Sequence, residues 1–168
     1  MKLVVFCVET DKKAQTDNKY IDKAIREFYV IDNNIKIAYA YMNGKGNYNK
    51  KSVALQIKRH FSGDFDEKHV VYCIDADDIA DGDVIDQNRK IKEFCDELNY
   101  HLIWFFRDIE EVFLHKRVNR SEKLAESDKF RRTKGLCKAT QNTLSSNHEN
   151  PKHSNFLCVL DHFMEKHV

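Results

Sequence analysis

Four short apolar runs alternate with amphipathic segments over the first two thirds of the chain. The runs are "KLVVFCV" at 2–8, "IKIAYAYM" at 35–42, "HVVYCI" at 69–74 and "YHLIWFF" at 100–106. The first run is apolar without alternation, which is typical of a strand that is covered on both faces. We therefore expect four β-strands, and we expect the first to lie inside the sheet.

The segments between these runs place apolar side chains at helical spacing, as expected for helices that bury one face. The alternation of strand and helix favours an α/β fold with a parallel sheet and helices on both faces. The apolar stripes of the three expected helices are Tyr20, Ile21, Ala24, Ile25 and Phe28; Val53, Ile57 and Phe61; and Ile85, Ile91, Phe94, Cys95 and Leu98.

The rest of the chain has the pattern of helices without further strands. Residues 107–118, "RDIEEVFLHKRV", are amphipathic, apolar patches follow near 124–130 and 136–144, and a last helix is expected over 156–164. The segment "TLSSNHENPKHSN" contains the single proline, Pro151, and predicts an exposed loop. We expect residues 1–120 to form the α/β domain and 121–168 a helical C-terminal extension packed on the same domain.

Composition narrows the class of protein. A length of 168 residues suggests one domain, and a net charge of +1 gives no global attraction to nucleic acid or membrane, so any polyanion site must be local. No apolar run reaches the roughly 20 residues that a membrane helix needs, and no secretory signal is apparent. The five cysteines form no CxxC pair, which argues against a structural zinc site and favours reduced thiols in the cytoplasm.

Candidate chemistry gathers where the expected strands end. Glu9 follows the first strand, Lys45 lies in a glycine loop after the second, Asp75 and Asp77 follow the third, and Arg107 follows the fourth. In an open parallel sheet, ligands bind beyond the carboxyl ends of the strands, and Mg²⁺ prefers hard oxygen ligands. The acidic run "DADDIADGD" is therefore either a solvated loop or part of a cation site, since close carboxylates repel one another.

This pattern resembles the Toprim domain over residues 2–106. The shared features are the glutamate that closes the first strand, the glycine loop "NGKG" and the "DAD" that closes the third strand. Within that superfamily the layout is similar to the small RloB-like proteins and the overcoming-lysogenization-defect (OLD) type proteins of bacterial defence loci. One departure is Thr10, which replaces the glycine that usually follows the glutamate and makes a wider turn.

The resemblance implies a Toprim-like (Rossmann-like) four-stranded parallel sheet and a Mg²⁺- or Mn²⁺-dependent nuclease, or a related phosphoryl-transfer protein. The resemblance also implies action on DNA or RNA in phage defence, and a partner protein from the same locus. Glu9, Asp75 and Asp77 would hold the metal, or Glu9 would instead act as a general base. Lys45 would bind a phosphate oxygen, and Arg107 would offset the negative charge that develops in the transition state. The alternative is a non-catalytic accessory subunit with the same fold, which the near-zero net charge favours.

Other polar clusters have simpler interpretations. The histidines near the C-terminus lack a metal-binding spacing, and Trp104 and Phe105 are expected in the core. Six basic residues form either a strip that follows a phosphate backbone or a solvated helix face, and the neutral total charge favours the second. These residues are Lys116, Arg117, Arg120, Arg131, Arg132 and Lys134.

Overall fold

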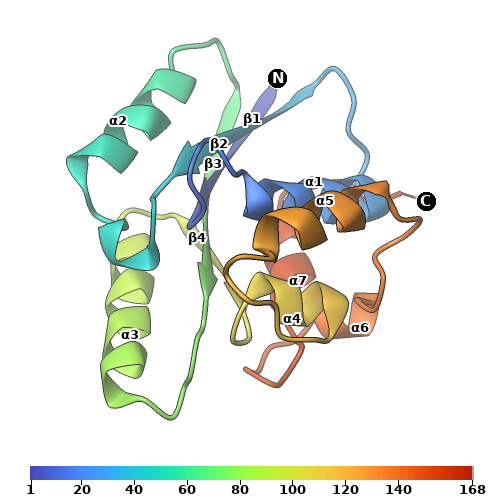
Figure 1. The fold of residues 1–168 in the computed structure, drawn as a ribbon. Helices are drawn as coiled ribbons and strands as arrows, with labels where there is room; N and C mark the ends of the chain where they lie inside the picture. The colour runs from blue at the N-terminus through green and yellow to red at the C-terminus, as the bar shows by residue number, and fades with distance from the viewer. Residues whose placement is uncertain (168) are drawn as a thin grey trace.

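The computed structural model describes residues 1–167 and shows one four-stranded sheet, all parallel, in the order β2-β1-β3-β4 (Figure 1). The strands are β1 (Lys2–Val8), β2 (Ile35–Tyr41), β3 (Glu67–Asp75) and β4 (His101–Phe105). This confirms the predicted α/β architecture with a parallel sheet. Leu3 to Val8 of β1 are completely buried, because β1 has a neighbour at each edge and helices over both faces.

Helices cover the two faces of the sheet unequally. Helices α2 (Lys51–His60) and α3 (Gly82–Glu97) lie on one face, and α1 (Thr16–Phe28) lies on the other (Figure 1). Alternate residues of β1 serve the two layers: Val4, Phe6 and Val8 belong to the core under α1, while Leu3, Val5 and Cys7 belong to the core under α2 and α3.

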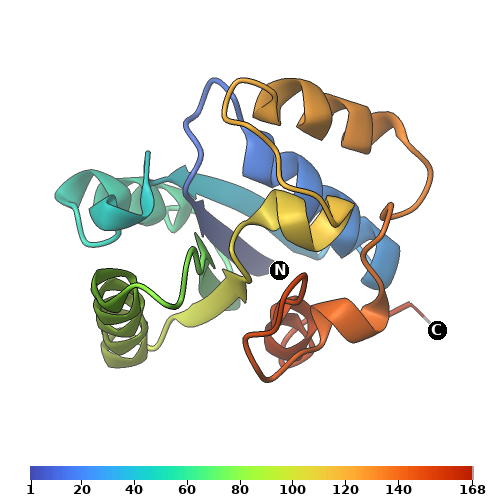
Figure 2. The same ribbon diagram turned by 60° about the horizontal axis from the view of Figure 1, so that its bottom comes forward.

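The helices that follow β4 all lie on the face of α1 (Figure 2). They are α4 (Ile109–Leu114), α5 (Lys123–Arg132), α6 (Gln141–Leu144) and α7 (Phe156–Leu160). Helix α5 runs along α1, where the ring centroids of Phe130 and Tyr20 are 4.6 Å apart. Helix α7 packs on β4, and Phe156 and Leu160 join the core under α1.

Three of the later helices, α4, α6 and α7, are shorter than the periodicity predicts. Helix α4 ends at Leu114 because His115 adopts a left-handed conformation with φ of 55°. Helix α7 ends at Leu160, after which the chain turns so that the Glu165 carbonyl accepts a hydrogen bond from the Val30 N–H, 2.8 Å away. Of the patch at 136–144, only 141–144 is helical. Phe105 is buried as predicted, but Trp104 is only half-buried.

The strand order creates a crevice between β1 and β3. The chain moves from β1 to β2 on one side and returns to place β3 on the other side of β1. The loops that follow β1 and β3 therefore lead to opposite faces, and the space between them is where doubly wound sheets bind ligands. A short 3₁₀ turn, η1 (Lys45–Asn47), lies in the loop after β2. Within residues 1–167, no helix is long and apolar enough to cross a membrane.

Candidate functional site at the carboxyl edge of the sheet

The fold brings together Glu9 and Asp75 at the crevice between β1 and β3. The Glu9 Oε1 accepts a hydrogen bond from the backbone N–H of Asp75 over 2.7 Å. The Asp75 Oδ1 accepts one from the N–H of Ile109, the first residue of α4, over 2.9 Å. The second oxygen of each carboxylate accepts no hydrogen bond from the residues that the structure describes, and it remains for a ligand.

Both carboxylates line a cavity of about 650 Å³. Its lining has two further acidic residues, Asp17 from the first turn of α1 and Asp11 from the loop before that helix. Lys123, at the start of α5, and Arg120, in the loop before α5, supply positive charge. Carboxylates and cations thus share one concave surface at the carboxyl ends of β1 and β3. Such a surface suits a phosphate that is bridged to the acids by a metal ion.

The environment of Glu9, Asp17 and Asp75 favours the protonated form of each carboxyl group. Burial raises the pKa of Glu9 to about 8, and Asp17 and Asp77 add to the effect, while the hydrogen bond from Asp75 and the charge of Lys45 oppose it. Burial, followed by repulsion from Glu9 and Asp17, raises the pKa of Asp75 well above its usual range. Burial also raises the pKa of Asp17. A bound cation would relieve this repulsion.

The two cations of the cavity differ in their partners. The Lys123 Nζ lies 2.8 Å from Oε2 of Glu110, which is completely buried. Burial lowers the pKa of Lys123, but Glu110 and Asp75 outweigh that effect and raise it, so the ammonium stays charged. Arg120 is exposed and has no ion pair with any residue in 1–167. Its guanidinium is therefore available to an anion.

Lys45 and Asp77 interact with each other outside this cavity. The buried Lys45 Nζ donates a hydrogen bond to the Asp75 carbonyl over 2.7 Å and pairs with the carboxylate of Asp77. Asp77 itself has a left-handed φ of 55°, and its N–H donates to the carbonyl of Arg107 over 2.9 Å. The Arg107 guanidinium lies 3.3 Å from Glu111. Of the five predicted site residues, only Glu9 and Asp75 line the cavity.

The glycine loop has a structural reason to contain Gly44. Its φ of 108° is a conformation that other residues rarely adopt, and its N–H donates to the carbonyl of Glu9 over 2.9 Å. The tight turn then directs Lys45 into the protein. Thr10, the departure from the Toprim pattern, accepts a hydrogen bond from the Thr16 N–H over 3.2 Å at the start of α1. The Thr10 N–H in turn donates to Asp17 over 3.2 Å, which holds that acid at the cavity.

Asp17 and Lys123 were not among the residues predicted for the site. Both lie in helical segments without a recognisable motif, and Lys123 reaches the cavity only because α5 packs along α1. Arg120 belongs to the group of six basic residues for which the sequence favours a solvated helix face. The one sequence signal for these site residues is at Arg120, an exposed cation that has no acidic residue three or four positions away to pair with.

The donor set fits an ion that is completed by water and substrate. Within residues 1–167, no group of three or more histidine, cysteine, aspartate or glutamate side chains is arranged to hold a metal ion. Glu9 and Asp75 offer two carboxylates, and Mg²⁺ is commonly held by one or two carboxylates together with substrate phosphates and water. Comparisons with models of known protein families, with curated proteins and with solved structures find no match to this chain. The Toprim resemblance therefore stays a prediction.

Proposed function

We propose that this chain is a Toprim-like, Mg²⁺- or Mn²⁺-dependent nuclease, or a related phosphoryl-transfer protein, that acts on nucleic acid phosphodiesters. The observation that carries this proposal is the carboxylate pair of Glu9 and Asp75. Each is fixed through one oxygen, each has a second oxygen available, and both have raised pKa values inside a cavity that also presents Arg120 and Lys123.

The acidic and basic residues of the cavity have separate roles in the proposed reaction. Glu9 and Asp75 would hold the ion and would give up their protons to water when it binds. When bound, the ion would polarise the phosphodiester and lower the pKa of a water ligand. Asp17, a further carboxylate of the cavity with a raised pKa, acts as general base, while the Arg120 guanidinium and the Lys123 ammonium bind phosphate oxygens.

The test combines metal binding with cleavage. Calorimetric titration with Mg²⁺ and Mn²⁺ should show binding to the wild type, none to Asp75→Asn, and unchanged binding to Asp83→Asn, an exposed acid of the same run. Incubation with double-stranded DNA, single-stranded DNA and RNA should then show cleavage that the Asp75→Asn variant lacks. Wild-type affinity for metal in the Asp75→Asn protein would show that the site is placed wrongly.

A second function, a non-catalytic accessory subunit of a defence or nucleic-acid-processing complex, is favoured by one contact. The ammonium of Lys45 engages Asp77, so only two of the three predicted metal ligands face the cavity. Metal binding at Glu9 and Asp75 without cleavage of any of the three nucleic acids would support this accessory function. Lys45→Met provides a further comparison of metal binding and cleavage, because it removes the ammonium that pairs with Asp77 and frees this carboxylate to join Glu9 and Asp75 as a ligand.

A further inference from the structure

A second polar cluster lies at the opposite end of the sheet, where β3 and β4 begin. His69 and His101 face each other across the two strands, with 3.1 Å between Nδ1 of His69 and Nε2 of His101. The other ring nitrogen of His69, Nε2, lies 2.6 Å from Oε1 of Glu67. The ring of His69 stacks on Phe163, with 4.0 Å between centroids and 11° between planes, so its orientation is fixed.

This arrangement defines the tautomer of His69. Because the Glu67 carboxylate can only accept, the proton of the neutral His69 ring lies on Nε2, and Nδ1 presents its lone pair to His101. The proton between the two rings therefore belongs to His101. Glu67 is itself held by Lys2, whose Nζ is 3.2 Å from its Oε2. A carboxylate behind an imidazole with a free lone pair is the outer-shell arrangement of histidines that bind metals.

The spacing of the two nitrogens also suits a metal. Two imidazole nitrogens that bind one ion at about 2.0–2.1 Å with tetrahedral angles lie about 3.3 Å apart. The 3.1 Å between His69 and His101 is close to that value, so an ion can bind both nitrogens after a small rotation of either ring, once the proton on Nε2 of His101 has moved to its Nδ1. Burial, followed by the charges of His69 and His162, lowers the pKa of His101, which keeps its ring neutral and competent to bind.

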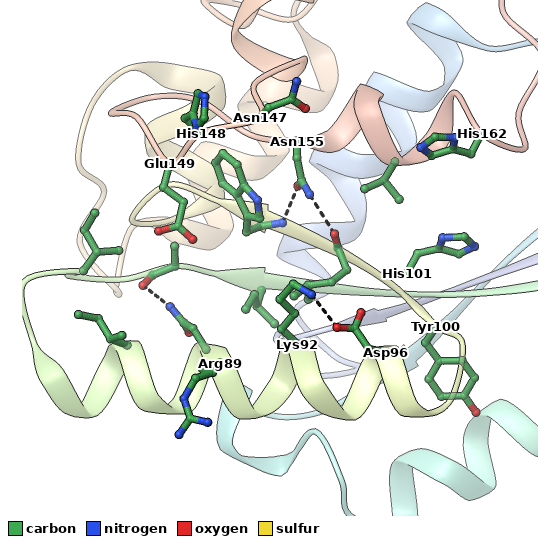
Figure 3. Close-up of a pocket in the computed structure, with 18 residues that line it drawn as sticks. Arg89, Lys92, Asp96, Tyr100, His101, Asn147, His148, Glu149, Asn155 and His162 are labelled. Atoms are coloured by element: carbon green, nitrogen blue, oxygen red, sulfur yellow. Dashed lines mark hydrogen bonds and ion pairs between the residues drawn. The ribbon is translucent and has the colours of Figure 1, made fainter.

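The cluster is reached through a second cavity of about 740 Å³, which runs between α3 and the C-terminal segment. His101 and His162 lie at the same end of this cavity (Figure 3). One wall is held in place by Asn155, whose side chain bonds the N–H of Trp104 and the carbonyl of Leu102 at 2.9 and 3.0 Å. Water or a small ion therefore has access to His101 and His162 from this cavity, and His69 lies next to His101.

We propose that His69 and His101 form a binding site for a transition-metal ion of the Zn²⁺, Ni²⁺ or Cu²⁺ class, with water or a rotated His162 in the remaining positions. Imidazole ligands favour such ions over Mg²⁺, so the site is chemically separate from the carboxylate pair. The ion would join β3 and β4 to the C-terminal segment that carries Phe163. Because no three ligands of residues 1–167 are already assembled, the site is a two-histidine site.

The experiment uses the full chain and its single tryptophan. Trp104 lines the same cavity as His101, so Cu²⁺ or Ni²⁺ bound there should quench its fluorescence, and Zn²⁺ titrated by calorimetry should bind one ion per chain. We expect His69→Gln and His101→Gln each to weaken binding at least about tenfold, and Glu67→Gln, which keeps the histidines, to weaken it by about 10–100-fold. His148→Gln, which alters another histidine of that cavity, should leave it unchanged.

The outcomes separate this site from the proposed nuclease centre. Asp75→Asn should leave Zn²⁺ binding intact, and excess Mg²⁺ should not compete with it. No binding of any of the three ions, or equal affinity in the wild type, His69→Gln and His101→Gln, would overturn the proposal. Circular dichroism of each variant establishes that it is folded, and Glu67→Gln provides the test should either histidine variant fail to fold.

Discussion

The raised pKa values of Glu9 and Asp75 predict that the metal-free protein becomes less stable as the pH rises. The perturbation that isolates this effect is Asp75→Asn. The asparagine Oδ1 can still accept the hydrogen bond from Ile109, so the substitution removes a charge and keeps the shape and the anchor. The substitution removes the carboxylate whose pKa is raised by burial and by the charge of Glu9.

The magnitude follows from the pKa of Glu9, which is raised from 4.5 to about 8. Between these values the folded state keeps a proton that the unfolded state has released, so the free energy of unfolding falls with increasing pH. The full shift corresponds to ~3 kcal/mol at neutral pH, which solvent in the open cavity reduces to ~1–2 kcal/mol. In Asp75→Asn the raised pKa of Asp75 no longer contributes, so this variant should lose less stability than the wild type between the two pH values, while the part caused by the burial of Glu9 should remain.

The assay is urea unfolding without metal at about pH 5 and about pH 7.5, where the linkage predicts the largest difference. Wild type and Asp83→Asn should lose the same amount of stability between the two conditions, and Asp75→Asn should lose clearly less. Mg²⁺ should restore stability at the higher pH in the wild type and in Asp83→Asn only. Identical pH dependence in wild type and Asp75→Asn would refute the coupling between Glu9 and Asp75.

Three further predictions concern the support of the site. Lys123→Met leaves the buried Glu110 carboxylate without its cation and should destabilise the fold by ~3 kcal/mol, while the double variant with Glu110→Gln should recover part of that loss in thermal unfolding. Phe130→Ala removes a buried ring between α5 and α1 and should lower the free energy of unfolding, measured in urea, by ~3–5 kcal/mol. The variant should also bind single-stranded DNA more weakly, because α5 positions the cations of the cavity. Gly44→Ala should lower the free energy of unfolding by ~1–2 kcal/mol, because Gly44 has a positive φ. Gly82→Ala, where an added Cβ meets nothing within 4 Å, should lower it by no more than about a few tenths of a kcal/mol. Equal losses in the two variants would contradict the role assigned to the turn at Gly44.

The sequence determined the sheet and most of its helices. The apolar runs and helical stripes are local patterns, and a strand such as β1 has to be apolar on both faces to lie in the centre of a parallel sheet. It also determined that Glu9 and Asp75 would share an edge, since parallel strands present their carboxyl ends to the same side. The ends of α4 and α7 could not be predicted from the sequence. The left-handed conformation of His115 and the hydrogen bond between Glu165 and Val30 depend on packing rather than on periodicity.

The choice among the polar residues of the site was made only by the tertiary structure. Glu9, Asp17, Asp75 and Asp77 are all acids near strand or helix ends, and nothing in their spacing shows which of them faces the cavity. That outcome depends on the buried position of Lys45, which engages Asp77, and on the packing of α5 along α1, which brings Lys123 to the acids. Side-chain direction and long-range packing are properties of the whole fold, whereas the periodicity that specifies a strand or a helix extends over only a few residues.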